Sequence, residues 1–287
     1  MLSQVVLNGC VTGLILALPA IALTLTYSIM QFPNFAIGAT LTTGAYLAFA
    51  LNGILHLPLF AAGAGASAGL ALLLAAADRA VFSKLRDRTP ITLLVASIGL
   101  AFVLENTARF IFGNSARSFD METGSVYEFQ GLRLNPEQGY AAITVAAALA
   151  AMYVLLNHSA LGRAMRAVAD NPPLAAVRGI DREAVIRKAW AVAGLLTGAA
   201  SVLAGLDRAI DPELGSSYLI SVFAAAILGG LGSVAGAVMG AILVGLMEEL
   251  STLIVSPNYR EATGFAAIAL ILLLRPEGLL GKARIRK

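Results

Sequence analysis

The sequence predicts an all-α protein, a polytopic transmembrane helical bundle with broken or re-entrant helices. Of its 287 residues, 58% are hydrophobic and 13% carry a charge, which is about half the charged share of a typical soluble domain. The apolar residues fall in long blocks, as a hydrocarbon environment demands. Runs such as residues 141–151 lack the period-two alternation that a membrane β-barrel requires.

Eight hydrophobic blocks can be marked, and a spanning helix needs about 20 residues. The blocks cover residues 5–30, 35–51, 57–77, 91–112, 139–157, 189–206, 218–247 and 263–274. Residues 1–287 are therefore interpreted as a single transmembrane domain.

Two of the blocks are interrupted. The first contains Pro19, which predicts a kink or a break, because proline removes a backbone donor and clashes with the preceding turn. The block 218–247 is too long for one span, and the small residues 229–233 divide it into halves that are short for two. We expect a re-entrant pair of half-helices or two short tilted helices there. Irregular backbone at that depth is tolerated only where protein or a water-filled cavity surrounds it.

Basic residues are distributed unevenly over the predicted loops. Segments 79–90, 159–188 and 275–287 hold fifteen of the twenty Lys and Arg residues, and the other loops hold five. Because cytoplasmic loops are enriched in Lys and Arg, these three segments are predicted to be cytoplasmic. Three spans before residue 79 then place the N-terminus outside, together with the long loop 113–138.

No motif for catalysis or for a cofactor is found. The closest approach to a phosphate-binding P-loop, residues 278–283, has the wrong spacing and ends in Ala283. Cys10 is the only cysteine, and neither His56 nor His158 has a metal-ligand partner nearby in the sequence. The sequence therefore predicts a protein that is not an enzyme, with no metal and no cofactor; if ATP drives transport, the ATPase is another chain.

Glu105 is the one carboxylate within a hydrophobic block. Arg109 follows four residues later, where the two side chains can pair on one helix face. An intramembrane carboxylate can indicate ion coupling, but an ion pair near the end of a helix is the favoured explanation here, which weakens a secondary-transporter interpretation.

Small residues mark a possible translocation path. Gly232, Gly236, Gly240 and Gly245 predict a smooth helix face for close packing. Near the N-terminus, the run 31–38 places polar Asn34 at the rim of a block. Broken helices offer backbone groups to substrates in many transporters, so both interruptions are candidates for one path. The candidate path residues are Asn34, Gly38, Gly229, Gly230, Gly232 and Ser233.

The polar segment 159–188 predicts two short helices joined by a rigid corner. Helical signal runs over 161–169, Asn171-Pro172 breaks it, and a second helix is expected over 172–178 with a stop at Gly179. Such a segment could dock another protein, or it could be a solvated loop that only fixes topology. The candidate docking residues are Arg163, Arg166, Asp170, Pro172, Leu174, Val177, Arg178 and Gly179.

Five ordered blocks resemble the permease subunits of branched-chain amino-acid ABC importers, the high-affinity systems that depend on a periplasmic binding protein. The shorter of the two permease types is the better match. The blocks are 24–48 (TLTYSIMQFPNFAIGATLTTGAYLA), 94–113 (LVASIGLAFVLENTARFIFG), 161–205 (beginning LGRAMRAVADNPPLAAVRGID), 224–249 (AAAILGGLGSVAGAVMGAILVGLMEE) and 272–281 (LLLRPEGLLG).

The resemblance implies a multi-pass, non-catalytic subunit of the bacterial inner membrane, in contact with lipid and not with nucleic acid. Its implied partners are a second permease subunit, two cytoplasmic ATPase subunits and a periplasmic substrate-binding protein. It also implies that 159–188 is the cytoplasmic coupling segment. Position 37 is Ile where the family pattern often has His, which leaves the substrate open among branched-chain and other amino acids, urea or amides, and aromatic acids. The alternative function is a secondary transporter or channel that works alone on small polar solutes.

Overall fold

The computed structural model describes residues 2–120, 127–129, 132–256, 259–274 and 278–281. Within these ranges the regular elements are all helical apart from a two-stranded antiparallel hairpin, β1 (Tyr127–Phe129) and β2 (Leu132–Leu134), which confirms the predicted fold class. The helices are α1 (Leu2–Met30), α2 (Ala36–Phe49), η1 (Ala50–Ile54), α3 (Leu59–Ala77), η2 (Asp78–Phe82), α4 (Ser83–Leu85), α5 (Pro90–Phe112), α6 (Pro136–His158), α7 (Ala160–Asp170), α8 (Pro172–Val177), α9 (Arg182–Asp207), α10 (Leu214–Gly229), α11 (Val234–Ser251) and α12 (Arg260–Leu274).

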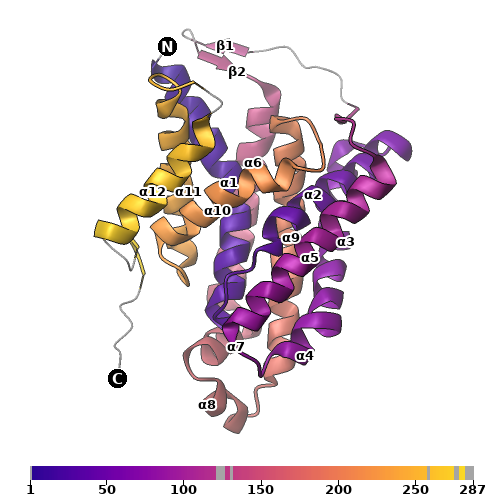
Figure 1. The fold of residues 1–287 in the computed structure, drawn as a ribbon, viewed down its shortest axis with the longest axis vertical. Helices are drawn as coiled ribbons and strands as arrows, with labels where there is room; N and C mark the ends of the chain where they lie inside the picture. The colour runs from indigo at the N-terminus through magenta and orange to yellow at the C-terminus, as the bar shows by residue number, and fades with distance from the viewer. Residues whose placement is uncertain (1, 121–126, 130–131, 257–258, 275–277, 282–287) are drawn as a thin grey trace.

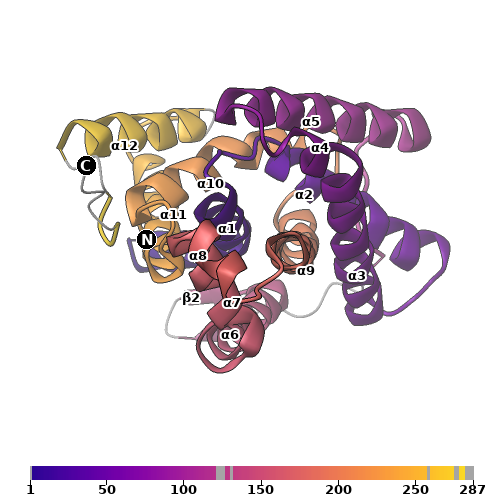
Figure 2. The same cartoon turned by 90° about the horizontal axis from the view of Figure 1, so that it is seen from below.

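Two helices, α1 and α9, form the centre of the bundle, and the others surround them (Figure 2). They pack against each other, and α1 also packs along α11 while α9 packs along α3. Close approach of α1 to α11 depends on Gly13, where an added Cβ would lie 2.6 Å from Cα of Ile242. Small residues therefore bring these backbones together, as in other membrane helix pairs.

Seven segments within the described ranges are helices long and apolar enough to cross a membrane. The interruption predicted in the block 218–247 is confirmed, because α10 ends at Gly229 and α11 begins at Val234. At 1.5 Å per residue the sixteen residues of α10 span about 24 Å, so α10 is shorter than the seven spans; α12 is shorter still.

One predicted boundary is wrong, and one of two alternatives is excluded. Of the kink or break predicted at Pro19, the break is not found, because the chain stays helical through it; buried helices tolerate proline where their neighbours supply the missing contacts. The third span does not end at residue 77. It continues through the π-helical turn η2 and α4 to Leu85, so the first residues of segment 79–90 belong to a helix and not to a loop.

The loops gather at two ends, as the charge count predicted. Segments 79–90 and 159–188 meet at the lower end in Figure 1, here called the basic end, where Arg86 contacts Glu183. At the opposite end the N-terminus meets the β hairpin through Gln4, and Asn52 accepts a hydrogen bond from the backbone N–H of Asp120 at 2.8 Å. The basic side chains of segment 275–287 lie outside the described residues.

Candidate functional site

The polar segment folds into the two short helices that the sequence predicted, and side chains cap each helix. Ser159 Oγ accepts a hydrogen bond from the Gly162 N–H at 3.0 Å at the start of α7. Asn171 Oδ1 accepts from the Leu174 N–H at 3.0 Å at the start of α8, and Asp181 accepts from two N–H groups at the start of α9. These caps fix where each helix begins, so the segment is a rigid connection and not a loose loop.

The end of α8 also agrees with the prediction. Gly179 has φ +78°, the left-handed conformation that ends many helices. One face of the segment packs on the bundle through Met165, Val168 and Ala175. The other face is turned outward, with Leu174 55% and Val177 84% exposed. An apolar edge of two residues spaced i and i+3 is thus open to a partner.

The charged candidates of the segment lie around this edge and on α7. Arg163, Asp170 and Arg178 are exposed. Arg166 is exposed as well, but it folds back and donates to the carbonyl oxygen of Leu156, near the end of α6, where a cation is favoured by the helix dipole. Arg166 therefore fastens α7 to α6, whereas Arg163 and Arg178 remain available at the surface.

The first group of candidate path residues lies at the start of α2. Asn34 is buried, and its Oδ1 accepts a hydrogen bond from the Ala36 N–H at 3.0 Å, so its partner is the backbone of its own turn. Gly38 lies against α10, where an added Cβ would be 2.6 Å from the Gly215 carbonyl oxygen. Ile37 is buried in the core.

The second group forms the turn between α10 and α11. Gly229 packs directly against Gly236, and Ser233 caps α11 by accepting a hydrogen bond from the Gly236 N–H at 3.1 Å. Gly230 and Gly232 have φ of +101° and +100°, which side chains rarely adopt.

The predicted glycine face on α11 needs two corrections. Gly232 precedes the helix, and an added Cβ there would meet nothing within 4 Å, so conformation and not packing requires glycine. The remaining glycines serve two different neighbours: Gly236 and Gly240 pack on α10, whereas Gly245 packs on α1 near Gly13.

The two groups share α10 but lie at different heights on it. The ring of Phe35 packs on the ring of Phe223 at a centroid distance of 4.7 Å. Phe223 precedes Gly229 by six residues, or about 9 Å along a helix. The structure therefore places both interrupted segments along one helix without bringing them together into a single cluster.

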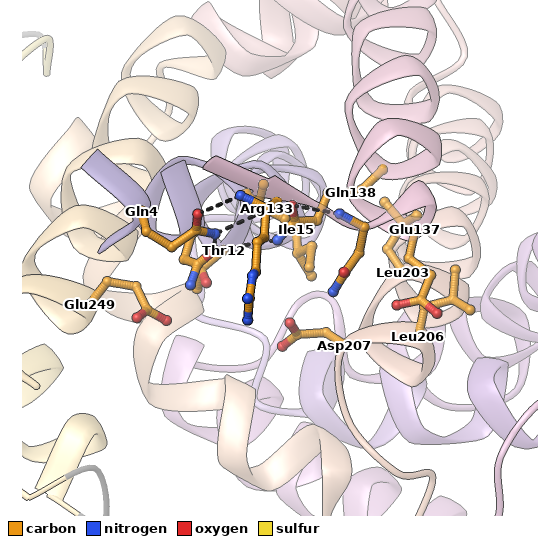
Figure 3. Close-up of a pocket in the computed structure, with 14 residues that line it drawn as sticks. Gln4, Thr12, Ile15, Arg133, Glu137, Gln138, Leu203, Leu206, Asp207 and Glu249 are labelled. Atoms are coloured by element: carbon orange, nitrogen blue, oxygen red, sulfur yellow. Dashed lines mark hydrogen bonds between the residues drawn. The ribbon is translucent and has the colours of Figure 1, made fainter. Parts of the chain in front are cut away.

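A pocket of about 340 Å³ opens at the end opposite the basic end (Figure 3). Amides join its walls: Gln4 and Gln138 both donate to Asn8 Oδ1, at 3.2 and 3.3 Å, and Gln4 also exchanges hydrogen bonds with the backbone of Arg133. Thr12, Arg133 and Asn135, the carboxylates of Glu137, Asp207 and Glu249, and aliphatic residues complete the lining. The candidate path residues are not part of it; the amide network fastens β2 and α6 to α1.

Two ion pairs lie near the same end. The predicted pair is confirmed, with Arg109 Nη2 3.1 Å from Glu105 Oε1 and 3.7 Å from Glu213 Oε1. A second group was not predicted. Buried Glu248 accepts from Ser221 of α10 and lies 3.4 Å from Arg260 of α12.

Arg260 extends this second group to a second carboxylate of α11 and to α1. Its Nη2 lies 2.9 Å from Glu249 Oε1 and donates to Thr12 of α1 at 2.9 Å. Arg260 thus joins α12 to α1 and α11, and the hydrogen bond from Ser221 to Glu248 adds α10 to the group. The adjacent Glu248-Glu249 pair at the end of a hydrophobic block was the signal in the sequence.

Comparison with known proteins agrees with these features. Residues 5–274 match the family model for the branched-chain amino acid transport system permease component. The high-affinity branched-chain amino acid transport system permease protein LivH of Escherichia coli strain K12 is 30% identical over 304 residues, 99% of this chain and 97% of the relative. The corresponding protein BraD of Pseudomonas aeruginosa is 27% identical over 301 residues, with the same coverage.

A solved structure shares the fold. PsaBC from Streptococcus pneumoniae in complex with Fab aligns with a TM-score of 0.51 over 94% of this chain and 91% of that chain, at 14% identity. That likeness concerns the fold alone. The family match, in contrast, extends over nearly the whole sequence and agrees with the five blocks recognised in it. The chain belongs to the family of branched-chain amino acid transport system permease components.

Proposed function

We propose that this multi-pass permease subunit forms the translocation path of a binding-protein-dependent ABC importer for branched-chain amino acids in the bacterial inner membrane. Relatives that align over nearly the whole chain carry that substrate in their names, which supports the substrate class. The complete importer would contain a second permease subunit, two cytoplasmic ATPase subunits and a periplasmic substrate-binding protein.

Within the coupling segment 159–188, residues 159–181 are the part of this subunit that would receive the ATPase. The observation that carries this proposal is the outward edge of α8, where Leu174 and Val177 are exposed on a capped and rigid helix pair. An apolar anchor with a charged rim is typical of residues that dominate small interfaces. Arg163 and Arg178 supply that rim.

Besides docking the ATPase, the coupling segment would have to pass motion to the spans, and this requires a rigid connection. One residue separates α6 from α7, and four residues separate α8 from α9. Asn171, Pro172 and the cap at Asp181 fix the corners of the segment. Because little slack separates α8 from the two long helices, a displacement of α8 by an ATPase would move them.

The test is Leu174→Asp, which places a charge at the centre of the proposed contact and leaves the spans intact. The variant is expected at normal abundance in the membrane, with loss of ATPase co-purification and of substrate-stimulated ATP turnover. Loss of one interface anchor weakens binding by at least about fivefold, since such truncations cost more than roughly 1 kcal/mol. Leu55→Asp is the matched control, because Leu55 is also exposed but lies at the opposite end.

Unchanged ATPase association in Leu174→Asp would show that 159–181 only fixes topology. Substrate class is measured separately, by reconstituting the complete importer with its binding protein and comparing uptake of leucine, isoleucine and valine with uptake of urea and an aromatic acid. Preference for either of the latter would contradict the proposed substrate.

A further inference from the structure

Three charged side chains join the two basic segments at the basic end. The guanidinium of Arg86 pairs with the carboxylates of Asp78 and Glu183. Asp78 begins the π-helical turn η2, whereas Glu183 lies in the first turn of α9, two residues after the cap Asp181. The side chains of Arg86 and Asp78 are only 4% and 2% exposed, against 49% for Glu183.

An aromatic contact ties the same two elements together. Phe82 lies midway between Asp78 and Arg86 in the sequence, and its ring stacks on Trp190 of α9 at a centroid distance of 4.8 Å. Both rings are fully buried. Residues spaced by four lie on one side of a helix, so the continuation of α3 presents an ionic and an aromatic contact to the start of α9.

A buried ion pair contributes little net free energy to holding two helices together. Desolvation offsets much of the attraction between buried charges, so an apolar pair of similar size would often hold the helices as well. Within the described part of the chain, Nε of Arg86 has no hydrogen-bond partner, so the pairing is not even complete. The guanidinium of Arg86 also pairs with half-exposed Glu183. An apolar side chain at this position could not make that ion pair.

We propose that Arg86 is a positioning residue that carries motion of the coupling segment into α3. Segment 79–90 would then be a second connection between the coupling segment and the membrane spans, besides the direct links to α6 and α9. This rests on the proposed docking of α8 on an ATPase subunit. Glu183 lies in the first turn of α9, within the coupling segment 159–188, and therefore moves with it. Arg86, held by buried Asp78, links that motion to the end of α3, while Phe82 and Trp190 keep the two helices in register.

Glu183→Gln is the cleanest test, because Glu183 is half exposed and its loss leaves the Arg86–Asp78 pair intact. The variant in the complete importer is expected to reach the membrane and to retain its ATPase subunits. Substrate transported per ATP hydrolysed should fall by roughly five- to tenfold, the lower part of the range of coupling between distant sites. Asp87→Asn is the matched control, because Asp87 is an exposed carboxylate beside Arg86.

A second set of variants separates coupling from stability. Replacing Asp78 and Arg86 together by Leu removes the link without leaving a lone buried charge. This double variant should show the same loss of coupling at normal abundance. Adding Glu183→Gln to it should then cause no further loss, because residues that act as one unit are not additive.

Three outcomes would overturn the proposal. The first is transport per ATP in Glu183→Gln equal to that in Asp87→Asn. The second is an undiminished further loss when Glu183→Gln is added to the double variant. The third is loss of ATPase co-purification in Glu183→Gln, which would make Glu183 a docking residue. Failure of the docking proposal itself is measured with Leu174→Asp. The readout there is co-purification of the ATPase and not the substrate transported per ATP hydrolysed.

Discussion

At the scale of single residues, glycine is required in this chain for two different reasons, close backbone contact and backbone conformation. Gly236 is required by contact, because its backbone touches that of Gly229 and leaves no room for a side chain. Gly232 is required by conformation, with φ +100° and open space where a Cβ would be. Spacing in the sequence could not separate them, since φ angles and neighbours are set by the turn that they form.

This difference can be measured with single methyl groups. Gly236→Ala should lower the thermal stability of the detergent-solubilised subunit, because backbone of α10 must move. Gly232→Ala should also lower it, by an amount typical of a strained left-handed residue, about 1–2 kcal/mol. Gly99→Ala in α5, which meets nothing within 4 Å, should be neutral or stabilising because Ala is the better helix former. Equal effects at all three positions would contradict this account.

At the scale of elements, local chemistry was sufficient to predict the coupling segment. Proline and glycine placed the corner at Asn171-Pro172 and the stop at Gly179, and the observed helices α7 and α8 begin and end within a residue of the predicted ranges. These signals are short-range, so the sequence contains them directly. The interruption at 229–233 was predictable for the same reason.

Long-range contacts were the part that the sequence did not reveal. Hydropathy falls at Asp78-Arg79, so the third span was expected to end there, yet the helix continues because Arg86 and Phe82 supply partners from later turns and from α9. The buried Glu248 group likewise depends on Arg260, twelve residues away, and on Ser221. Neither partner can be identified from spacing alone.

The cap of α8 gives a prediction at this scale. Asn171→Ala removes the hydrogen bond to the Leu174 N–H in a helix of only six residues, and loss of such a cap costs about 1 kcal/mol. Hydrogen exchange at residues 174–178 should become faster, and ATPase affinity should fall about fivefold because α8 must be ordered on binding. Asn171→Ser, which keeps a capping oxygen, should behave like the parent. An Ala variant with unchanged exchange would show that packing alone orders α8.

At the scale of the whole molecule, the distribution of charge and the folded arrangement agree. Segments predicted to share a side do meet: residues near Phe32 with the turn at Phe82, and Asn52 with Asp120. Figure 1 shows the N-terminus and the β hairpin at one end and α4, α7 and α8 at the other. The fold was predictable at this level because a lipid environment requires long apolar helices, and because the charge of the loops indicates which of them share a side of the membrane.

Which end faces the cytoplasm is the remaining prediction, and single cysteines can test it. In a Cys10→Ser background, Asp87→Cys and Asp170→Cys place thiols at exposed positions of the basic end, and Ser118→Cys places one at an exposed position of the other end. A membrane-impermeant maleimide added to intact spheroplasts should label Ser118→Cys alone, and inverted vesicles should reverse the pattern. The reason is that Lys and Arg resist transfer and gather on the cytoplasmic side, where fifteen of twenty are predicted. Labelling of Asp170→Cys from outside would reverse the orientation and remove the coupling segment from the reach of any cytoplasmic ATPase.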